Sequence, residues 1–188
     1  MVMPAMVGTW TIDMLDALPD DGQRYEIIDG ELFVTPGPGE IHQDVVGALF
    51  RLLADYMDTG DMGKAMIAPA DVRGGPNGRT RVQPDVFVVG LVAGKRPPYP
   101  YEIHDLLLAV EVVSPSNPFL DYQVKCDLYL REGVGEYWVI NPEARNVSRW
   151  QGCDDPGEVL SRTLTWHPAG MPTPFVLDLA RFFVEAIS

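Results

Sequence analysis

The sequence has few cysteines, few histidines, few basic residues and no long apolar run. These shortages exclude or disfavour several classes of protein, such as disulfide-stabilised and membrane-spanning proteins. Its two cysteines, Cys126 and Cys153, cannot form a disulfide framework, and neither lies in a C-x-x-C pair or beside a histidine. The apolar stretch from Val86 to Gly94 is far shorter than the roughly 20 residues that cross a bilayer, and no basic flank precedes an apolar run at the N-terminus. We therefore expect a cytoplasmic protein without membrane contact.

Length and apolar content predict one domain. With 188 residues, of which 46% are hydrophobic, the chain can build one well-buried core and is short for two ordinary domains. No internal repeat, low-complexity tract or linker divides it. We therefore expect a single domain over residues 1–188.

Basic residues are scarce and unevenly distributed. The 14 Lys and Arg residues stand against 27 Asp and Glu residues, which gives a formal net charge of −13. This charge opposes a nucleic-acid partner, because proteins that bind nucleic acids normally neutralise phosphates with a basic surface. Residues 1–61 hold twelve acidic and two basic side chains, whereas residues 64–100 hold six basic and two acidic ones. We therefore expect any basic surface around residues 64–100; the alternative is a set of solvated loop charges.

Apolar periodicity and turn residues predict helices mixed with strands. Asp29-Gly30 is typical of the turn of an N-terminal β-hairpin, and Thr11 of a helix cap. The predicted order is a helix within 9–18, a hairpin of 25–28 and 31–34, a helix over 41–56, strands at 65–72, 82–89 and 106–113, a helix over 119–132, a strand at 136–140, a peripheral hairpin of 147–150 and 159–166, and a closing helix over 177–187. Such mixing predicts an α/β fold, with a mixed β-sheet core flanked by helices.

Two carboxylates lie on predicted core strands. Glu111 interrupts the apolar strand 106–113 near its C-terminal end, and an isolated buried carboxylate is costly unless it is paired, protonated or bound to a metal. Asp85 follows Pro84 at the start of another apolar run, so neighbouring strands would let both acids share one ion. Oxygen ligands suit Mg²⁺ or Mn²⁺ rather than zinc. The alternatives are an internal salt bridge for Glu111 and a strand-start or turn residue for Asp85.

Lys125 lies on the predicted helix that follows the Glu111 strand, four residues after Asp121 and on the same helical face. It can point back at the two acids, where it could orient a metal-bound water, help to lower the pKa of that water, or stabilise charge on a phosphate. The alternative is a surface ion pair between Asp121 and Lys125.

These residues occur in an order that resembles a known superfamily. The residues that carry this resemblance are, in order, Pro84-Asp85, Glu111-Val112-Val113-Ser114-Pro115, Asp121 and Lys125. The sequence resembles the PD-(D/E)XK nuclease superfamily, and more narrowly the Uma-type restriction endonucleases of bacteria. Further agreement comes from residues 25–32, His42, Tyr129 and residues 133–142. The resemblance covers about residues 11–150, which leaves 151–188 as a C-terminal strand and helix extension.

The resemblance implies a restriction-endonuclease-like fold and gives each residue a role. Asp85, Glu111 and the carbonyl of Val112 would hold Mg²⁺ or Mn²⁺, and Lys125 would assist the attacking water. The superfamily pattern places the lysine two residues after the glutamate, where this sequence has Val113. Lys125 would therefore supply the positive charge from the following helix.

Glu26 and His42 would line the site by the same resemblance. Glu26 would bind the metal or support its ligands, and His42 would bind phosphate or orient water. The alternative for Glu26 is a cross-strand partner of Arg24 or of a neighbouring loop. The alternative for His42 is a capping or surface residue.

The function implied is that of a metal-dependent endonuclease that hydrolyses phosphodiester bonds, with DNA as the favoured substrate. Members of the superfamily often work as dimers, so a homodimer is expected. Two other functions stay open. One is a catalytically silent binding or assembly module that keeps the nuclease fold. The other is a metal-dependent phosphatase or nucleotide hydrolase, which the acidic composition suits better than long DNA.

Overall fold

The computed structural model describes residues 8–75, 78–114 and 117–187. Pro76 and Asn77 of a predicted loop, and Pro115 of the motif that follows Glu111, lie outside these residues. None of the helices in the described ranges has the length and apolar character needed to span a bilayer.

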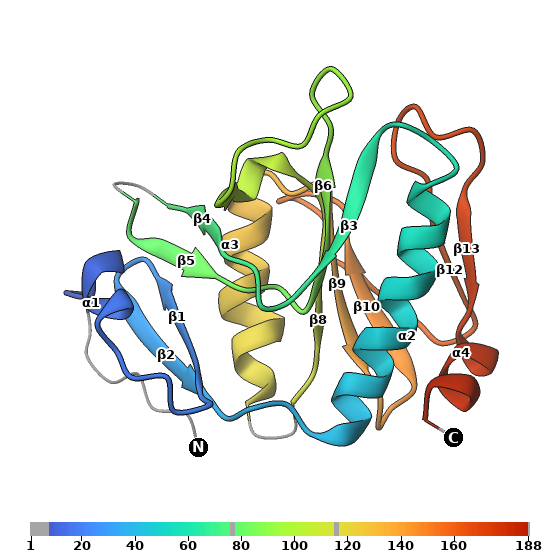
Figure 1. The fold of residues 1–188 in the computed structure, drawn as a ribbon. Coiled ribbons are helices and arrows are strands. Elements are labelled where there is room, and N and C mark those ends of the chain that lie inside the picture. Colours follow the sequence, from blue (N-terminus) through green and yellow to red (C-terminus); the bar gives the residue numbers. More distant parts are fainter. Residues whose placement is uncertain (1–7, 76–77, 115–116, 188) are drawn as a thin grey trace.

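A six-stranded mixed sheet forms the centre of the molecule (Figure 1). Its strand order is β11-β10-β9-β8-β6-β3, in which β8 and β9 are parallel and the other neighbours are antiparallel. The strands are β3 (Gly63–Ile67), β6 (Val86–Gly90), β8 (Leu106–Val112), β9 (Glu136–Asn141), β10 (Asn146–Trp150) and β11 (Glu158–Leu160). Every residue of β8 except Leu107 is buried, which confirms the prediction of a central strand covered on both faces.

A five-stranded sheet of order β2-β1-β5-β4-β7 carries the N-terminal hairpin. Its strands are β1 (Arg24–Ile28), β2 (Glu31–Thr35), β4 (Val72–Gly74), β5 (Thr80–Val82) and β7 (Tyr101–Glu102). Asp29 and Gly30 adopt φ values of 52° and 84°, the left-handed conformation that a two-residue hairpin turn requires. The helix α1 (Ile12–Asp16) contacts β1, and the Thr11 hydroxyl accepts the Met14 N–H at 3.3 Å as the predicted cap. The hairpin prediction is confirmed.

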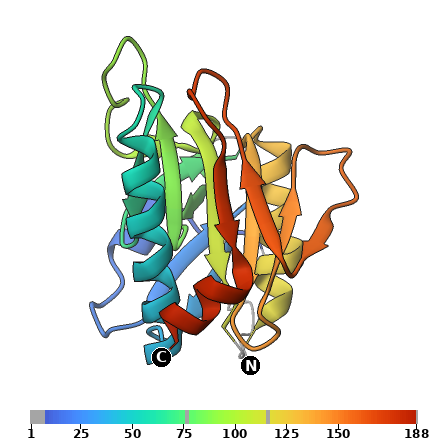
Figure 2. The same ribbon diagram turned by 90° about the vertical axis from the view of Figure 1, so that its right-hand side faces the viewer.

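Helices and a small hairpin cover the two faces of the central sheet. The face turned to the viewer in Figure 2 is covered by α2 (Glu40–Met57), by the hairpin of β12 (Thr163–Trp166) and β13 (Phe175–Asp178), and by α4 (Leu179–Ala186). The other face is covered by a helix that begins with a π-helical segment, η3 (Leu120–Lys125), and continues as α3 (Cys126–Arg131). A single turn of 3₁₀ helix, η2 (Ile103–Asp105), leads into β8. This arrangement confirms the predicted α/β fold.

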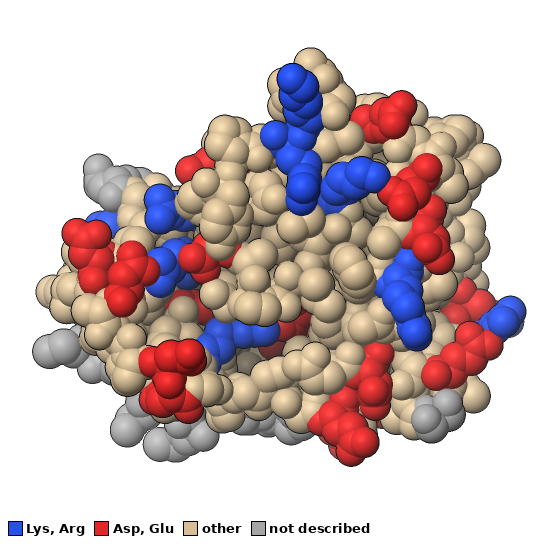
Figure 3. Space-filling view, viewed as in Figure 1, with Lys and Arg blue, Asp and Glu red and all other residues tan. Residues whose placement is uncertain are grey.

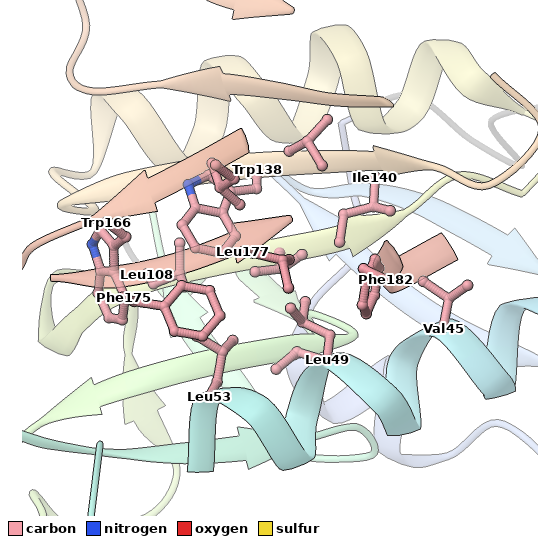
Figure 4. Close-up of a cluster of buried hydrophobic side chains, with 14 of the residues drawn as sticks. Val45, Leu49, Leu53, Leu108, Trp138, Ile140, Trp166, Phe175, Leu177 and Phe182 are labelled. Carbon is pink, nitrogen blue, oxygen red and sulfur yellow. The ribbon is translucent and has the colours of Figure 1, made fainter. Parts of the chain in front are cut away.

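The apolar spacing of α2 explains its position on the sheet. Val45, Leu49 and Leu53 recur at helical spacing and are fully buried. They pack in one cluster with Trp138 of β9 and Phe182 of α4 (Figure 4). The C-terminal segment therefore completes the core on the α2 face of the sheet.

Two predicted strands are each divided between the two sheets. The stretch 65–72 forms β3 and then β4, and 82–89 forms β5 and then β6. The second break falls at Gln83, Pro84 and Asp85, because a proline cannot donate to the ladder of a central strand. The prediction of continuous strands was wrong, and the break leaves Asp85 at the start of β6.

The predicted C-terminal hairpin was also wrong in part. β10 pairs with β11, but residues 163–166 form β12 and pair with β13, which was not predicted. The closing helix begins at Leu179 rather than at residue 177, because Asp178 caps it by accepting the Arg181 N–H at 3.0 Å.

Candidate active site

A cavity of about 860 Å³ opens at the end of the central sheet where β8 ends and α2 begins, the lower end of the molecule in Figure 1. The β1 strand, the start of β6, the end of β8, the first turn of α2, the π-helical segment and the β9–β10 turn all contribute to its lining. All five predicted site side chains line it, and so does Val112. They are Glu26, His42, Asp85, Glu111 and Lys125.

Asp85 lies at the centre of a hydrogen-bonded group and is 2% exposed. Its Oδ1 accepts a hydrogen bond from the Arg24 guanidinium at 2.8 Å, and its Oδ2 accepts one from the Val112 backbone N–H at 2.9 Å. Oδ2 also lies 3.0 Å from Nε2 of His42. Burial opposes ionisation of Asp85, but the His42 hydrogen bond and the Arg24 charge outweigh burial, so its pKa is well below the ordinary value. Asp85 is therefore an anion at neutral pH.

Lys125 connects the two other predicted acids. Its ammonium lies 2.9 Å from Oε2 of Glu26 and 3.0 Å from Oε1 of Glu111, and all three side chains are at most 2% exposed. Oε1 of Glu111 also accepts the Tyr129 hydroxyl at 3.1 Å, and Oε1 of Glu26 accepts the Gln83 N–H at 2.7 Å. Burial opposes the charge of Lys125, but Glu111 and Glu26 outweigh burial and raise its pKa above the ordinary value. Lys125 is thus a permanent cation.

A fourth carboxyl group, that of Asp121, completes the cluster. Its side chain is buried, and burial raises its pKa to about 7 despite the opposing charge of Lys125. Burial likewise raises the pKa of Glu111 well above the ordinary value, and the neighbouring Asp85 and Asp121 raise it further. The cluster thus holds more acid than its cations neutralise, and it favours an additional proton or metal cation.

The helix that follows β8 places three of these groups. Asp121, Lys125 and Tyr129 are spaced by four residues, and all three are buried. Asp121 and Lys125 lie in the π-helical segment, a wider turn that occurs frequently at functional sites. The Asp121 carbonyl also accepts the Tyr137 hydroxyl at 2.9 Å, which ties this segment to β9. The sheet therefore fixes the segment that carries the cluster.

The contacts decide between the alternatives for individual residues. The surface ion pair of Asp121 with Lys125 is wrong, because both side chains are buried. Glu26 pairs with Lys125 and accepts the N–H of Gln83 in the connection between β5 and β6, whereas Arg24 pairs with Asp85. His42 is held against Asp85 and is neither a cap nor an exposed residue, since its side chain is only 15% exposed.

Sequence reasoning missed the roles of Arg24, Asp121 and Tyr129 in the cluster. Each lies at a spacing that could have indicated it. Arg24 is two residues before Glu26 on the same strand, so both side chains point to one face of β1. Asp121 and Tyr129 lie four residues before and after Lys125 on the same helical face.

The residues of the cavity fit a hard divalent cation in chemistry and in charge. The described ranges hold no group of three His, Cys, Asp or Glu side chains at metal-ligating spacing. In the buried cluster alone, the four carboxyl groups of Glu26, Asp85, Glu111 and Asp121 nevertheless gather around two permanent cations, Arg24 and Lys125. The formal excess is two negative charges, which one Mg²⁺ or Mn²⁺ would balance. The donors are oxygen atoms, as these ions prefer.

The basic segment predicted around residues 64–100 does not supply the cavity. None of its basic side chains belongs to the lining. Lys64 pairs with Asp58 and Arg81 with Asp16, while Lys95 and Arg96 lie on the loop between β6 and β7. Figure 3 shows basic side chains over this loop at the top of the molecule and acidic ones around α1 and α2. These basic side chains do not reach the cavity because β6 runs away from Asp85, which carries its following loop to the opposite end of the sheet.

The mixed sheet, the flanking helices and the N-terminal hairpin define a restriction-endonuclease-like fold. Residues 12–171 match the family Uma2, described as "Putative restriction endonuclease", and the chain belongs to this family. A solved structure described as a putative nuclease belonging to DUF820 from Anabaena variabilis ATCC 29413 shares the fold. Its TM-score is 0.72 at 18% sequence identity, and the alignment covers 94% of this chain and 99% of that one. No curated protein matches the sequence.

Proposed function

We propose that this protein is a metal-dependent endonuclease that hydrolyses phosphodiester bonds, with DNA as its substrate. The observation that carries the proposal is the convergence of Asp85, Glu111 and Lys125, from three separate elements, in one cavity. Membership of the Uma2 family supports a nuclease over other uses of this fold. The homodimer and the cytoplasmic location stay predictions.

Asp85, Glu111 and the carbonyl of Val112 would hold Mg²⁺ or Mn²⁺. When bound, the ion would lower the pKa of a water molecule and polarise the phosphate. Arg24 and the Val112 N–H fix both oxygens of Asp85, so this carboxylate is oriented before any ligand arrives. Tyr129 fixes Oε1 of Glu111 in the same way. Such preorganisation is what a metal site needs from its supporting residues.

Lys125 acts through its charge. Because its pKa is raised, it does not accept a proton from water at neutral pH and is no general base. Its ammonium can stabilise the negative charge that develops on the phosphate oxygens. Hydrolysis joins the water oxygen to phosphorus, breaks one P–O ester bond, and delivers a proton to the leaving oxygen.

Circular DNA tests the proposal, because only internal cutting linearises a circle. The purified protein is incubated with single-stranded circles and with supercoiled plasmid, in Mg²⁺ or Mn²⁺ and in chelator. We expect metal-dependent cutting that is abolished in Asp85→Ala and Glu111→Ala and kept in Asp58→Ala, whose carboxylate is two-thirds exposed on the surface. Asp85→Asn preserves the shape of the side chain, so a loss of cutting in this variant is not explained by misfolding. Unchanged cutting by the Asp85 and Glu111 variants would refute the assignment.

Calorimetry separates the two other functions. A silent module would bind neither Mn²⁺ nor Mg²⁺, whereas the proposed site binds an ion in a manner that depends on Asp85. A nucleotide hydrolase would release phosphate from nucleotides and leave both kinds of circle intact.

A further inference from the structure

The two carboxylates proposed to bind the metal lie below the protein surface. Asp85 is 2% exposed and Glu111 is 1% exposed, although both line the cavity. A scissile phosphate must therefore enter the cavity to reach them. The volume of about 860 Å³ is within the range of pockets that enclose one small organic molecule, about 300–1,000 Å³. This space suits one nucleotide with its flanking phosphate and does not suit a base-paired duplex.

Four prolines contribute to the cavity wall. Pro36 and Pro38 follow β2, Pro118 precedes the π-helical segment, and Pro142 lies in the β9–β10 turn. Ile41 of α2 adds an apolar side chain that is 52% exposed. Proline rings offer flat apolar surface but have no N–H donor, so they can contact a nucleobase without reading its edges. Their fixed φ angles also limit widening of the cavity mouth.

Arg145 is the exposed cation of the cavity wall, which also carries the exposed carboxylates of Glu40 and Glu143. Of the three Arg and Lys side chains in the lining, Arg24 and Lys125 are paired with the buried carboxylates. Arg145 is exposed, and its side chain makes no ion pair with any described residue. The β9–β10 turn fixes its place: Asn141 accepts the Ala144 N–H at 2.9 Å, and Arg145 adopts a left-handed φ of 50°. This guanidinium is free to bind a phosphate.

We propose that the substrate enters this cavity as a single strand, with one nucleobase against the proline wall and a flanking phosphate on Arg145. The inference rests on the proposed function and adds the strand state of its substrate. It also accounts for nucleic-acid binding by a protein of net charge −13, because one well-placed cation and apolar contact replace a broad basic surface. A duplex would have to separate its strands first, at a cost of a few kcal/mol per unpaired base.

The first test compares strands of one sequence. A labelled single-stranded oligonucleotide, its duplex, and the duplex with a single-stranded flap are measured for binding in chelator and for cleavage in Mn²⁺. We expect the single strand and the flap to be cut with kcat/KM at least about tenfold above that of the duplex, and to bind more tightly. Equal cutting of duplex and single strand would overturn the inference and leave the proposed function intact.

The second test replaces Arg145. Arg145→Gln should raise KM by about tenfold with little change in kcat. It should also reduce the slope of log binding constant against log salt by about 0.7, the contribution of one phosphate contact to a single strand. Arg145→Lys should keep the slope, because it keeps the charge. Lys95→Gln, an exposed cation at the other end of the sheet, is the matched control.

The outcomes distinguish the two proposals. If Arg145→Gln behaves like Lys95→Gln in both KM and salt slope, Arg145 does not hold the substrate and the inference fails. If the single strand binds with an Arg145-dependent slope and no DNA is cut, the proposed cleavage fails, and only single-strand binding at Arg145 is supported. Hydrolysis of mononucleotides alone would overturn both.

Discussion

Replacing Lys125 by methionine should destabilise the protein far more than the loss of an ordinary ion pair. The ammonium lies 2.9 Å from Glu26 and 3.0 Å from Glu111, and both carboxylates are about 1% exposed. Methionine fills the space but leaves two buried carboxylates without their cation. Removing one partner of a buried ion pair typically costs about 3–5 kcal/mol. Since domains of this kind are stable by only about 5–15 kcal/mol, the variant should be close to unfolding at pH 8.

The effect should depend on pH in a definite direction. Without Lys125, the pKa of Glu111 in the folded protein should rise further above its value in the unfolded chain. When the pKa of a carboxyl group is higher in the folded than in the unfolded protein, the folded protein binds the proton more tightly. This stabilises the folded state fully below the unfolded-state pKa, and the stabilisation is lost as the pH rises through the folded-state pKa. Lys125→Met should therefore be closer to wild-type stability at pH 5 than at pH 8.

Urea unfolding at the two pH values measures this effect. Lys64→Met is the matched control, because its ion pair with Asp58 is on the surface and should contribute about 0–1 kcal/mol. Adding Glu111→Gln to Lys125→Met should restore part of the stability, because one orphaned charge is removed. A cost for Lys125→Met that is no larger than that of Lys64→Met, at both pH values, would refute the reasoning.

Three further predictions concern the same cluster. Because burial raises the pKa of Asp121 to about 7, this group should make the metal-free wild type less stable as the pH rises from about 4 to about 7, by up to about 4 kcal/mol. Asp121→Asn should remove this contribution, so its stability should fall less over the same range. Urea unfolding across this pH range checks the prediction. Tyr129→Phe should cost about 2 kcal/mol in the same assay, since Glu111 loses a buried hydroxyl donor; an unchanged midpoint would contradict this role. Mn²⁺ at about 100 times its dissociation constant should stabilise the wild type by about 2.7 kcal/mol in thermal unfolding, and Asp85→Asn should remove this gain.

The local patterns of the sequence predicted those parts of the fold that neighbouring residues determine. The Asp29-Gly30 turn, the Thr11 cap and the spacing of Val45, Leu49 and Leu53 each act within a few residues, and the structure confirms all of them. The buried strand with Glu111 was also evident, because the apolar run of residues 106–110 that precedes this glutamate is unusual outside a core.

Long-range pairing could not be predicted in the same way. Residues 63–67 and 72–74 belong to different sheets, although residues 65–72 were predicted as one strand. β12 pairs with β13 and not with β10, and local periodicity does not specify which strand is the partner. The same limit applies to the cavity. Arg145 is not adjacent in the sequence to any predicted site residue. It lines the cavity because the β9–β10 turn passes there.

The composition of the cluster favours an active site over a silent module. Glu26, Asp85, Glu111 and Lys125 are all at most 2% exposed, so the fold removes four ionised or ionisable groups from water. Replacing a buried ion network by apolar residues of similar volume is often neutral or stabilising, by about 1–4 kcal/mol. A module that needed only the fold would lose nothing by such replacements. Burial instead keeps the pKa values of Glu111 and Asp121 above their ordinary values despite the charge of Lys125. Unbalanced, strongly shifted groups that line a cavity are characteristic of sites that bind or transform a ligand. The proposed cation and phosphate would complete this cluster and would offset the free energy that its burial costs.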